Sequence, residues 1–391
     1  MENSQYFQPM DPSLLINSIL QQAISTSASD IHIEPERGSL NIRLRIDGIL
    51  YPLSGLLETT PDEVISKIKV MAQMNIMEKR LPQDGHLEFS YLDKQFNFRV
   101  STTPTIYGEA VVLRMLNREG IIVDLENLGF SPPQLELVTR TINQPYGIVL
   151  ITGPTGSGKT TLLYSFLSIL NKQQRNIITL EDPVEYQMAN IRQMQINETI
   201  GWSFAKGMRA VVRQDPDIIM LGEIRDAETA TMAFQAALAG RLVFSTFHTF
   251  DVPGIIIRLI EMGIPRSVLA HALTGVVSSK LVRKICEACA VTVPATGAEL
   301  KILNLTSGQQ NLKKARGCEV CHTCGYLGRV GIFEILFFDE EIKENIMQER
   351  PEIPLYKLLK GKIKPTLYQS GVEKVVKGIT SLDEFVRVVG I

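Results

Sequence analysis

The chain has 391 residues, enough for two or three domains that each bury a core, and a formal net charge of −2. That balance excludes a protein that grips nucleic acid through a basic field over the whole molecule, although not through a local patch. No apolar run approaches the roughly 18 residues of a membrane span, and the first residues lack a signal-peptide pattern. We therefore expect a cytoplasmic chain, in which paired cysteines indicate a metal site rather than disulfides.

The N-terminal part, up to residue 118, predicts a compact α/β domain. Residues 13–24 and 61–77 carry apolar side chains at helical spacing and predict two helices. Residues 39–46 alternate strictly between apolar and polar side chains before an Asp-Gly turn, as in a half-buried strand. The same alternation on both sides of Asp93 predicts a hairpin.

A linker of residues 119–134 leads into a region with a different pattern. Within residues 135–283, the segments "GIVLIT", "NIITLED", "DIIMLGE" and "RLVFSTFHT" are short continuous apolar runs that end in polar or glycine-rich residues. Buried parallel strands have this pattern, and functional residues gather at their carboxyl ends. A cysteine-bearing segment, residues 284–330, follows, and residues 331–391 read as short amphipathic helices.

The segment "GPTGSGKT" matches the complete P-loop pattern between an apolar strand and a helix-forming stretch. Its glycines let backbone amides face phosphate groups at the start of the helix. Lys159 is expected to reach the β- and γ-phosphates, and the Thr160 hydroxyl to bind Mg²⁺. The predicted nucleotide-binding residues are Gly153, Pro154, Thr155, Gly156, Ser157, Gly158, Lys159, Thr160 and Thr161.

Carboxylates follow two of the other apolar runs. In "DIIMLGEIRD" the usual aspartate is replaced by Gly222, so Glu223 is the predicted base or water-orienting group. The segment "TLEDPVEY" supplies further candidates for holding the metal, because neighbouring parallel strands bring their carboxyl ends to the same crevice; the alternative is a solvated turn before Pro183. The predicted magnesium and acidic-box residues are Thr160, Glu181, Asp182 and Glu185.

The run "RLVFSTFHT" ends in Ser245, Thr246 and His248. A histidine at the end of a strand in a nucleotide-binding sheet is interpreted as a γ-phosphate sensor. The alternative is a histidine that merely completes a core hydrogen bond.

The order of these motifs resembles the secretion ATPase superfamily, which drives type II secretion and type IV pilus assembly. The P-loop, the acidic box "ITLEDPVEY", the segment "RQDPDIIMLGEIRD" and the histidine box "STFHT" share that family's order. The segments "ASDIHIEP", "RIDG", "LPQDGH" and "RVSTTPTIYGEAVVLRML" look like its second N-terminal domain. The resemblance runs from about residue 12 to the end of the chain. It implies a RecA-like P-loop NTPase domain with a smaller N-terminal α/β domain, a zinc-bound insertion and a helical C-terminal region.

The resemblance also gives two strand arginines a role. Arg99 and Arg114 stand at the family's arginine-finger positions, which neutralise charge during phosphoryl transfer. From the residues alone, they are outward charges on strands. Asp30, His32 and Glu34 alternate along one strand face and suggest a metal site, but the resemblance favours a structural role there.

The chain departs from the family's pattern at three positions. Arg241 replaces a histidine before the histidine box, Phe250 replaces an asparagine after it, and Lys280 stands where an arginine is common. These departures are expected to alter nucleotide sensing or contacts between subunits. The sequence also leaves no room for the extra N-terminal domain with which longer members dock onto a membrane partner, so docking is expected to differ or the sequence to be shortened.

Four of the five cysteines form two Cys-x-x-Cys pairs with 28 residues between them. Such pairs predict a closed tetrahedral zinc site, although the spacer is longer than usual. The resemblance supports zinc, because assembly ATPases carry this tetracysteine segment and retraction ATPases lack it. The predicted ligands are Cys286, Cys289, Cys318 and Cys321. Cys324 is interpreted as a spare thiol; the alternatives are that Cys324 or His322 replaces a ligand, or that the pairs are redox-active.

The resemblance implies a protein-secreting ATPase, with ATP, Mg²⁺ and Zn²⁺ bound, in a homohexameric ring at the cytoplasmic face of the inner membrane. Its expected partners are an inner-membrane platform protein and a docking protein at the cytoplasmic face, with no nucleic acid. The ring would add pilin-like subunits to a secretion pseudopilus, a pilus or a DNA-uptake filament. Three alternatives remain: a nucleic-acid-translocating motor, a scaffold that binds ATP without hydrolysing it, and a pilus-retraction motor.

Overall fold

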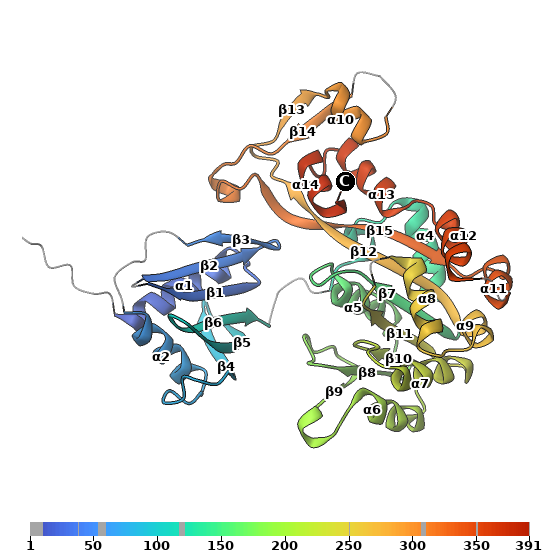
Figure 1. The fold of residues 1–391 in the computed structure, drawn as a ribbon, viewed down its shortest axis with the longest axis horizontal. Coiled ribbons are helices and arrows are strands. Elements are labelled where there is room, and N and C mark those ends of the chain that lie inside the picture. The colour runs from blue at the N-terminus through green and yellow to red at the C-terminus, as the bar shows by residue number, and fades with distance from the viewer. Residues whose placement is uncertain are drawn as a thin grey trace, which may run out of the picture. The chain divides into compact units, whose positions relative to one another are not determined.

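The structure, a computed structural model, describes residues 11–37, 39–53, 60–116, 122–249, 251–305, 310–348 and 351–390. The chain divides into two compact units, an N-terminal unit of Met1–Glu119 and a motor unit of Gly120–Ile391 (Figure 1). Within the described ranges, no helix is both long enough and apolar enough to cross a membrane.

The N-terminal unit is an antiparallel sheet covered on one face by two helices. The sheet has the order β3-β2-β1-β6-β5-β4. Its strands are β1 Asp30–Glu36, β2 Ser39–Ile46, β3 Ile49–Pro52, β4 Gln83–Tyr91, β5 Lys94–Thr105 and β6 Gly108–Met115. Helices α1 (Pro12–Ser25) and α2 (Pro61–Met71) share one apolar core with the inward side chains of the strands. The predicted first helix, the alternating strand and the hairpin around Asp93 are confirmed.

The second predicted helix is wrong at its C-terminal end. Helix α2 ends at Met71 instead of continuing to residue 77, and Gln73 has a left-handed φ of 57°. The following loop is held by side chains rather than by helical hydrogen bonds. The Gln83 amide accepts from the Asn75 amide N–H at 2.9 Å and donates to the Asn75 carbonyl at 3.0 Å. Apolar spacing did not reveal this contact because Gln83 lies on the next strand.

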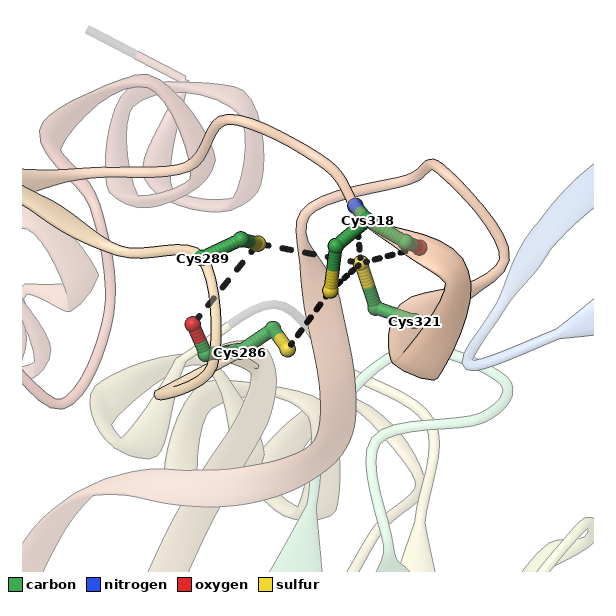
Figure 2. Close-up of side chains that lie close together, drawn as sticks. All are labelled: Cys286, Cys289, Cys318 and Cys321. Atoms are coloured by element: carbon green, nitrogen blue, oxygen red, sulfur yellow. Dashed lines mark hydrogen bonds between the residues drawn. The ribbon is translucent and has the colours of Figure 1, made fainter.

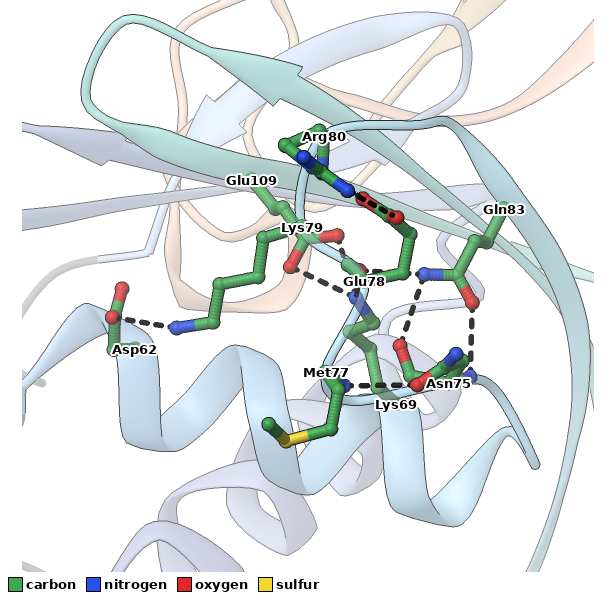
Figure 3. Close-up of polar contacts among 9 residues, drawn as sticks. All are labelled: Asp62, Lys69, Asn75, Met77, Glu78, Lys79, Arg80, Gln83 and Glu109. Carbon is green, nitrogen blue, oxygen red and sulfur yellow. Dashed lines mark hydrogen bonds and ion pairs between the residues drawn. The ribbon is translucent and has the colours of Figure 1, made fainter.

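A buried ion pair fixes the same loop to the sheet. The Lys69 ammonium donates to Glu109 at 2.7 Å and to the Glu78 carbonyl at 2.6 Å, as Figure 3 shows. The side chains of Lys69 and Glu109 are only 1% and 4% exposed. Removal of one partner would leave the other charge buried without compensation.

We therefore expect Lys69→Met to destabilise the N-terminal unit by about 3–5 kcal/mol. The measurement is hydrogen exchange of β5 and β6 in the full chain. Lys79→Met is the control, because its pair with Asp62 is 52% and 68% exposed and its loss should cost about 1 kcal/mol or less. Equal protection of the β5 and β6 amides from hydrogen exchange in the two variants would contradict a stabilising role for Lys69.

The motor unit is built on a seven-stranded sheet of order β15-β12-β7-β11-β10-β8-β9. All neighbouring pairs are parallel except β12 with β15. The four predicted buried parallel strands are confirmed as β7, β8, β10 and β11. The strands are β7 Gly147–Thr152, β8 Ile177–Glu181, β9 Arg192–Gln195, β10 Ile218–Leu221, β11 Leu242–Phe247, β12 Leu273–Ile285 and β15 Tyr326–Phe337.

Helices pack on both faces of this sheet and form two apolar clusters. One cluster contains α4 (Pro132–Ile142) and α5 (Lys159–Leu170). The other contains α6 Phe204–Val211, α7 Ala227–Leu238, α8 Val252–Glu261 and α9 Arg266–Ala272. The predicted C-terminal helices are confirmed from residue 340 on, as α11 Glu340–Met347, α12 Glu352–Lys362, α13 Leu367–Val376 and α14 Leu382–Val389. The prediction of helices from residue 331 is wrong, because residues 331–337 continue strand β15 and pair with β12.

Part of the segment predicted as a linker packs on the motor unit. It forms the short helix α3 (Leu125–Leu128), and the Phe130 ring stacks on Phe333 with ring centroids 3.9 Å apart. Both Leu125 and Phe130 are buried. Burial of these side chains holds the segment against the sheet.

The cysteine-bearing segment is an excursion between two long strands. Strand β12 leaves the main sheet at Ile285, and β15 returns to it from Tyr326. Between them lie β13 (Val291–Pro294), α10 (Gly297–Ile302) and β14 (Asn311–Lys314). Strands β13 and β14 pair antiparallel, so the two ends of the excursion return to the same place.

Candidate nucleotide site and cysteine cluster

The P-loop connects the carboxyl end of β7 to the start of α5. Gly153 has φ 146°, and a Cβ there would lie 2.3 Å from the Ser279 carbonyl and 2.5 Å from the Ser157 hydroxyl. Gly158, with φ 87°, is the N-cap of α5. Only glycine fits the first position, and both positions have left-handed backbones. The loop thus leads directly into the N-terminus of α5, the end of a helix that favours phosphate binding.

Lys159 begins α5 and folds back over the loop. Its ammonium donates to the Gly153 carbonyl at 2.7 Å and to the Pro154 carbonyl at 3.0 Å. Burial lowers the pKa of Lys159, while the negative charge of Glu223 opposes that shift. Thr160 and Thr161 follow in the first helical turn and are half-buried. The predicted nucleotide-binding residues therefore form one continuous loop and helix start.

Glu223 lies just beyond β10, beside an arginine and a histidine. It forms an ion pair with Arg225, and one of its oxygens lies 3.1 Å from His248 Nε2. Burial opposes ionisation of Glu223, but Arg225 and His248 outweigh it and lower the pKa of the carboxyl group. Glu223 is thus a carboxylate at neutral pH and is 18% exposed. It has the charge and accessibility that a base requires.

The neighbouring strand ends hold Glu223 in place. Strand β11 lies beside β10, and the Thr246 hydroxyl donates to the Gly222 carbonyl at 2.6 Å. Ser245 is fully buried within β11. His248 follows that strand and is 55% exposed, so it faces solvent rather than completing a core hydrogen bond.

The acidic segment separates its three predicted members. Glu181 is 4% exposed and accepts hydrogen bonds from Tyr164 at 2.5 Å, Thr179 at 2.5 Å and Gln193 at 3.1 Å. Asp182 is 37% exposed and lies 3.7 Å from Arg225. Glu185 is exposed in the loop that follows. The segment is therefore more than a solvated turn, because its first carboxylate is built into the sheet.

Two residues of the site were missed in the sequence. Arg225 pairs with both Glu223 and Asp182, so it joins the ends of β10 and β8. Its position two residues after Glu223 in "GEIRD" was the available signal. Tyr164, one of the apolar-looking residues of α5, had no signal in the sequence, since its partner Glu181 lies 17 residues away.

The two predicted arginine fingers lie side by side on the N-terminal sheet. Arg99 on β5 is directly opposite Arg114 on β6, and Arg114 is opposite Asp30 on β1. Directly opposite residues share one face of a sheet. Arg114 donates to Asp30 at 2.8 Å, and Arg99 lies 3.5 Å from Asp84. Their side chains remain 65% and 55% exposed, respectively.

The two carboxylates among the alternating residues of β1 pair with arginines. Asp30 lies 3.7 Å from Arg45, and Glu34 lies 2.6 Å from Arg43. Burial, followed by the positive charge of Arg45, lowers the pKa of His32. Among the described residues, the four-cysteine group is the only cluster with metal-binding geometry. The structural interpretation of Asp30, His32 and Glu34 is thus the better one.

Two of the departures from the family's pattern lie within the described residues, Arg241 at the amino end of its strand and Lys280 between two residues that approach the P-loop glycines. Arg241 precedes β11, at the amino end of the strand, and donates to the Ala239 carbonyl at 3.1 Å. The Lys280 ammonium donates to the Val388 carbonyl of α14 at 3.1 Å. Phe250 lies outside the described residues. Arg241 therefore has no place in sensing the nucleotide bound at its own P-loop.

The two Cys-x-x-Cys pairs meet at the base of the excursion (Figure 2). The sulfurs of Cys286 and Cys318 are 3.9 Å apart, and Cys321 lies 3.8 Å from both Cys289 and Cys318. A tetrahedral site with Zn–S bonds of about 2.3 Å places its sulfurs about 3.8 Å apart. All four sulfurs lie within 4.8 Å of one another. The cluster thus fits a zinc ion, and the antiparallel pairing of β13 with β14 explains the long spacer.

Backbone amides support the thiolate form that zinc requires. The N–H groups of Cys318 and Gly325 donate to Cys321 Sγ at 3.2 and 3.1 Å. Burial raises the pKa of Cys321, but these amides lower it to about 7. Cys324 is outside the cluster, where its thiol donates to the Tyr326 carbonyl at 3.1 Å. His322 is exposed and is not a member of the cluster either.

Comparison with known families and proteins gives consistent matches over almost the whole chain. Residues 7–387 match the family described as Type II/IV secretion system protein. Type II secretion system protein E of Pseudomonas aeruginosa is 43% identical over 375 residues, which are 96% of this chain and 74% of that protein. The type IV pilus assembly ATPase PilB of Thermus thermophilus is 44% identical over 372 residues, which are 94% of this chain and 42% of that protein.

Solved structures resemble the chain as well. The pilus retraction motor PilT with bound ADP has a TM-score of 0.66 and 28% identity, covering 95% of this chain and 96% of PilT. The ATPase DotB of Legionella pneumophila has a TM-score of 0.70 and 23% identity, covering 98% of this chain and 96% of DotB. Together with the cysteine cluster, these likenesses confirm the predicted fold class, a RecA-like P-loop NTPase domain with a smaller α/β domain, a cysteine insertion and a helical C-terminal region.

Proposed function

This chain belongs to the Type II/IV secretion system protein family, and from that membership we propose how its residues convert ATP hydrolysis into movement. The chain is a motor ATPase of the kind that powers assembly of a type II secretion pseudopilus or a type IV pilus. One observation carries the chemical part of the proposal. The P-loop lysine lies at the same edge of the sheet as the paired carboxylate Glu223.

Hydrolysis at this edge needs phosphate binding and an activated water. The P-loop amides and Lys159 hold the phosphates, and the Thr160 hydroxyl binds Mg²⁺, which neutralises charge on them. Glu223 accepts the proton of the attacking water, because it is ionised and partly exposed. His248 hydrogen-bonds Glu223 and senses the γ-phosphate from the neighbouring strand end. The acidic residues Glu181, Asp182 and Glu185 complete the metal environment.

Arg99 and Arg114 act as arginine fingers in this scheme. They form an exposed pair of positive charges on one face of the N-terminal sheet. Such charges stabilise the negative charge that develops during phosphoryl transfer. The opposing carboxylates Asp84 and Asp30 hold them in place until a phosphate competes for them.

Proteins of this family work within secretion machines, and for this chain we propose a homohexameric ring at the cytoplasmic face of the inner membrane. Its partners are the inner-membrane platform protein and a docking protein of the machine, and ATP-driven closure of the N-terminal unit onto the motor unit moves the platform. The proposed domains are the N-terminal α/β domain (1–118), the linker (119–134), the ATPase core (135–283), the cysteine-bearing lobe (284–330) and the C-terminal region (331–391). Zinc held by the four cysteines keeps the 284–330 lobe folded.

Lys159→Ala tests the proposal directly. Loss of the ammonium removes a charge from the phosphates, so kcat/KM for ATP should fall by about 100-fold or more. The measurement is phosphate release by the purified full chain. Lys172→Ala is the control, because that lysine is exposed just beyond the other end of α5 and should retain full turnover.

Turnover that survives Lys159→Ala would rule out hydrolysis at this P-loop. A wild-type chain that binds ATP without turnover would indicate a scaffold. Strong stimulation of wild-type turnover by single-stranded DNA would instead support the nucleic-acid-translocating alternative, which expects a basic groove bearing aromatic side chains.

A further inference from the structure

The hydroxyl of Tyr164 is fully used inside the motor unit. It donates to Glu181 Oε2 at 2.5 Å and accepts from the amide N–H groups of Glu185 at 3.2 Å and Tyr186 at 3.4 Å. A tyrosine hydroxyl offers one donor and two acceptor sites, so these three contacts exhaust it. Tyr164 itself is completely buried.

Tyr164 links the nucleotide helix to the acidic segment. It lies four residues after Thr160 on α5, so the two side chains share one face of the helix, a single turn apart. The other end of the link is the loop between β8 and β9. Residues 182–191 of this loop have no regular secondary structure, so no backbone ladder fixes their position. Hydrogen bonds to side chains must hold this loop in position instead.

The Glu181 carboxylate is held in position by uncharged hydrogen-bond donors. Among the described residues no cation forms an ion pair with it, and its partners are Tyr164, Thr179 and Gln193. A buried carboxylate without a cation is stable only if donors satisfy its oxygens. Burial, followed by the charge of Glu181, raises the pKa of Tyr164, so the tyrosine remains a donor throughout the physiological range.

We propose that Tyr164 is a positioning residue for ATP hydrolysis, whose hydroxyl holds the acidic segment of residues 181–186 in register with the P-loop helix. The link reaches the reacting groups through a short chain of contacts. Asp182 follows Glu181 directly and lies 3.7 Å from Arg225, which pairs with Glu223. A shift of the acidic segment therefore moves Arg225 and, through it, changes the position of the Glu223 carboxylate. This inference rests on the proposed function, since it assumes that the acidic segment serves hydrolysis.

Tyr164→Phe removes only the hydroxyl. We expect kcat for ATP to fall by about 10-fold, with KM for ATP within about twofold and the Mg²⁺ concentration for half-maximal turnover raised. The P-loop contacts are unchanged, so binding of ADP should persist. The thermal midpoint should fall by roughly 3–8 °C, because buried polar groups lose their partner.

Tyr326→Phe is the matched control. Its hydroxyl forms a partly buried hydrogen bond of 2.6 Å with the Ser381 hydroxyl. Tyr326 is the first residue of β15 and is remote from the P-loop. This variant should lower the thermal midpoint without changing kcat or the Mg²⁺ dependence. If Tyr164→Phe also lowers only the thermal midpoint, Tyr164 is merely structural and the inference is overturned.

Thr179→Val provides a second test that leaves Tyr164 intact. It removes the hydroxyl that donates to the other oxygen of Glu181, so it should raise the Mg²⁺ requirement in the same direction. This variant also serves if Tyr164→Phe fails to fold; an unchanged Mg²⁺ dependence would then overturn the inference. A wild-type chain without ATP turnover would overturn both this inference and the proposed function, whereas normal wild-type turnover with unaltered variants overturns this inference alone.

Discussion

Glu223→Gln is expected to lower kcat for ATP by about 1000-fold while ATP still binds with nearly wild-type affinity. The amide cannot accept the proton of the attacking water, whereas the P-loop, Lys159 and Thr160 remain unchanged. Arg225 and His248 lower the pKa of Glu223; in this variant His248 loses its carboxylate partner and Arg225 retains Asp182. The measurement combines phosphate release under single-turnover conditions with equilibrium binding of a labelled ATP.

The matched control for this prediction is Glu228→Gln. Glu228 lies on the exposed surface of α7, where it pairs with Arg209, and both side chains are 56% exposed. Its loss should change turnover by less than about twofold, because exposed pairs contribute little. A Glu223→Gln variant that retained a tenth or more of wild-type kcat would exclude Glu223 as the base. The base would then be sought in the acidic segment.

Cys321→Ser is expected to release the zinc and unfold the lobe of residues 284–330. The described residues of the lobe form a two-stranded sheet, one short α-helix and a single 3-10 turn, and such a pair of strands is marginal in water. Its apolar contacts are shared with α13 and α14 through a small cluster that includes Leu312 and Phe385. Zinc binding must supply the rest of the free energy that keeps the lobe folded, and loss of zinc should destabilise the lobe by about 4 kcal/mol or more.

Zinc content and limited proteolysis of the full chain test this expectation. Wild type should hold one zinc per chain, and Cys321→Ser close to none, with new cleavage confined to the lobe. Cys324→Ser is the control, since its sulfur hydrogen-bonds to the backbone of Tyr326 and is outside the four-cysteine cluster. If Cys324→Ser also loses zinc, or Cys321→Ser retains it, the ligand set is wrong. A folded, metal-free wild-type chain would argue against a structural zinc altogether.

Local patterns accounted for many of the elements and for the phosphate-binding loop. Four continuous apolar runs predicted four of the six strands that lie in parallel pairs, because strands buried on both faces need apolar side chains throughout. The P-loop is equally local, since its glycines, Lys159 and Thr160 are consecutive. The cysteine pairs were recognisable for the same reason, although the pairing of β13 with β14 was needed to bring them together.

Contacts between distant segments decided the rest. No local period distinguishes Tyr164 from the leucines beside it, yet its hydroxyl donates to Glu181 at the end of β8. Lys69 and Glu109 are likewise 40 residues apart, and only the packing of α2 on the sheet makes them a buried pair. The sequence by itself determined the phosphate loop, four of the buried strands and most of the predicted helices, because these depend on neighbouring residues. It did not determine the end of α2, the short helix α3 or strand β15. The tertiary structure alone decided which polar groups are buried together, because burial and pairing depend on residues that the fold brings into contact.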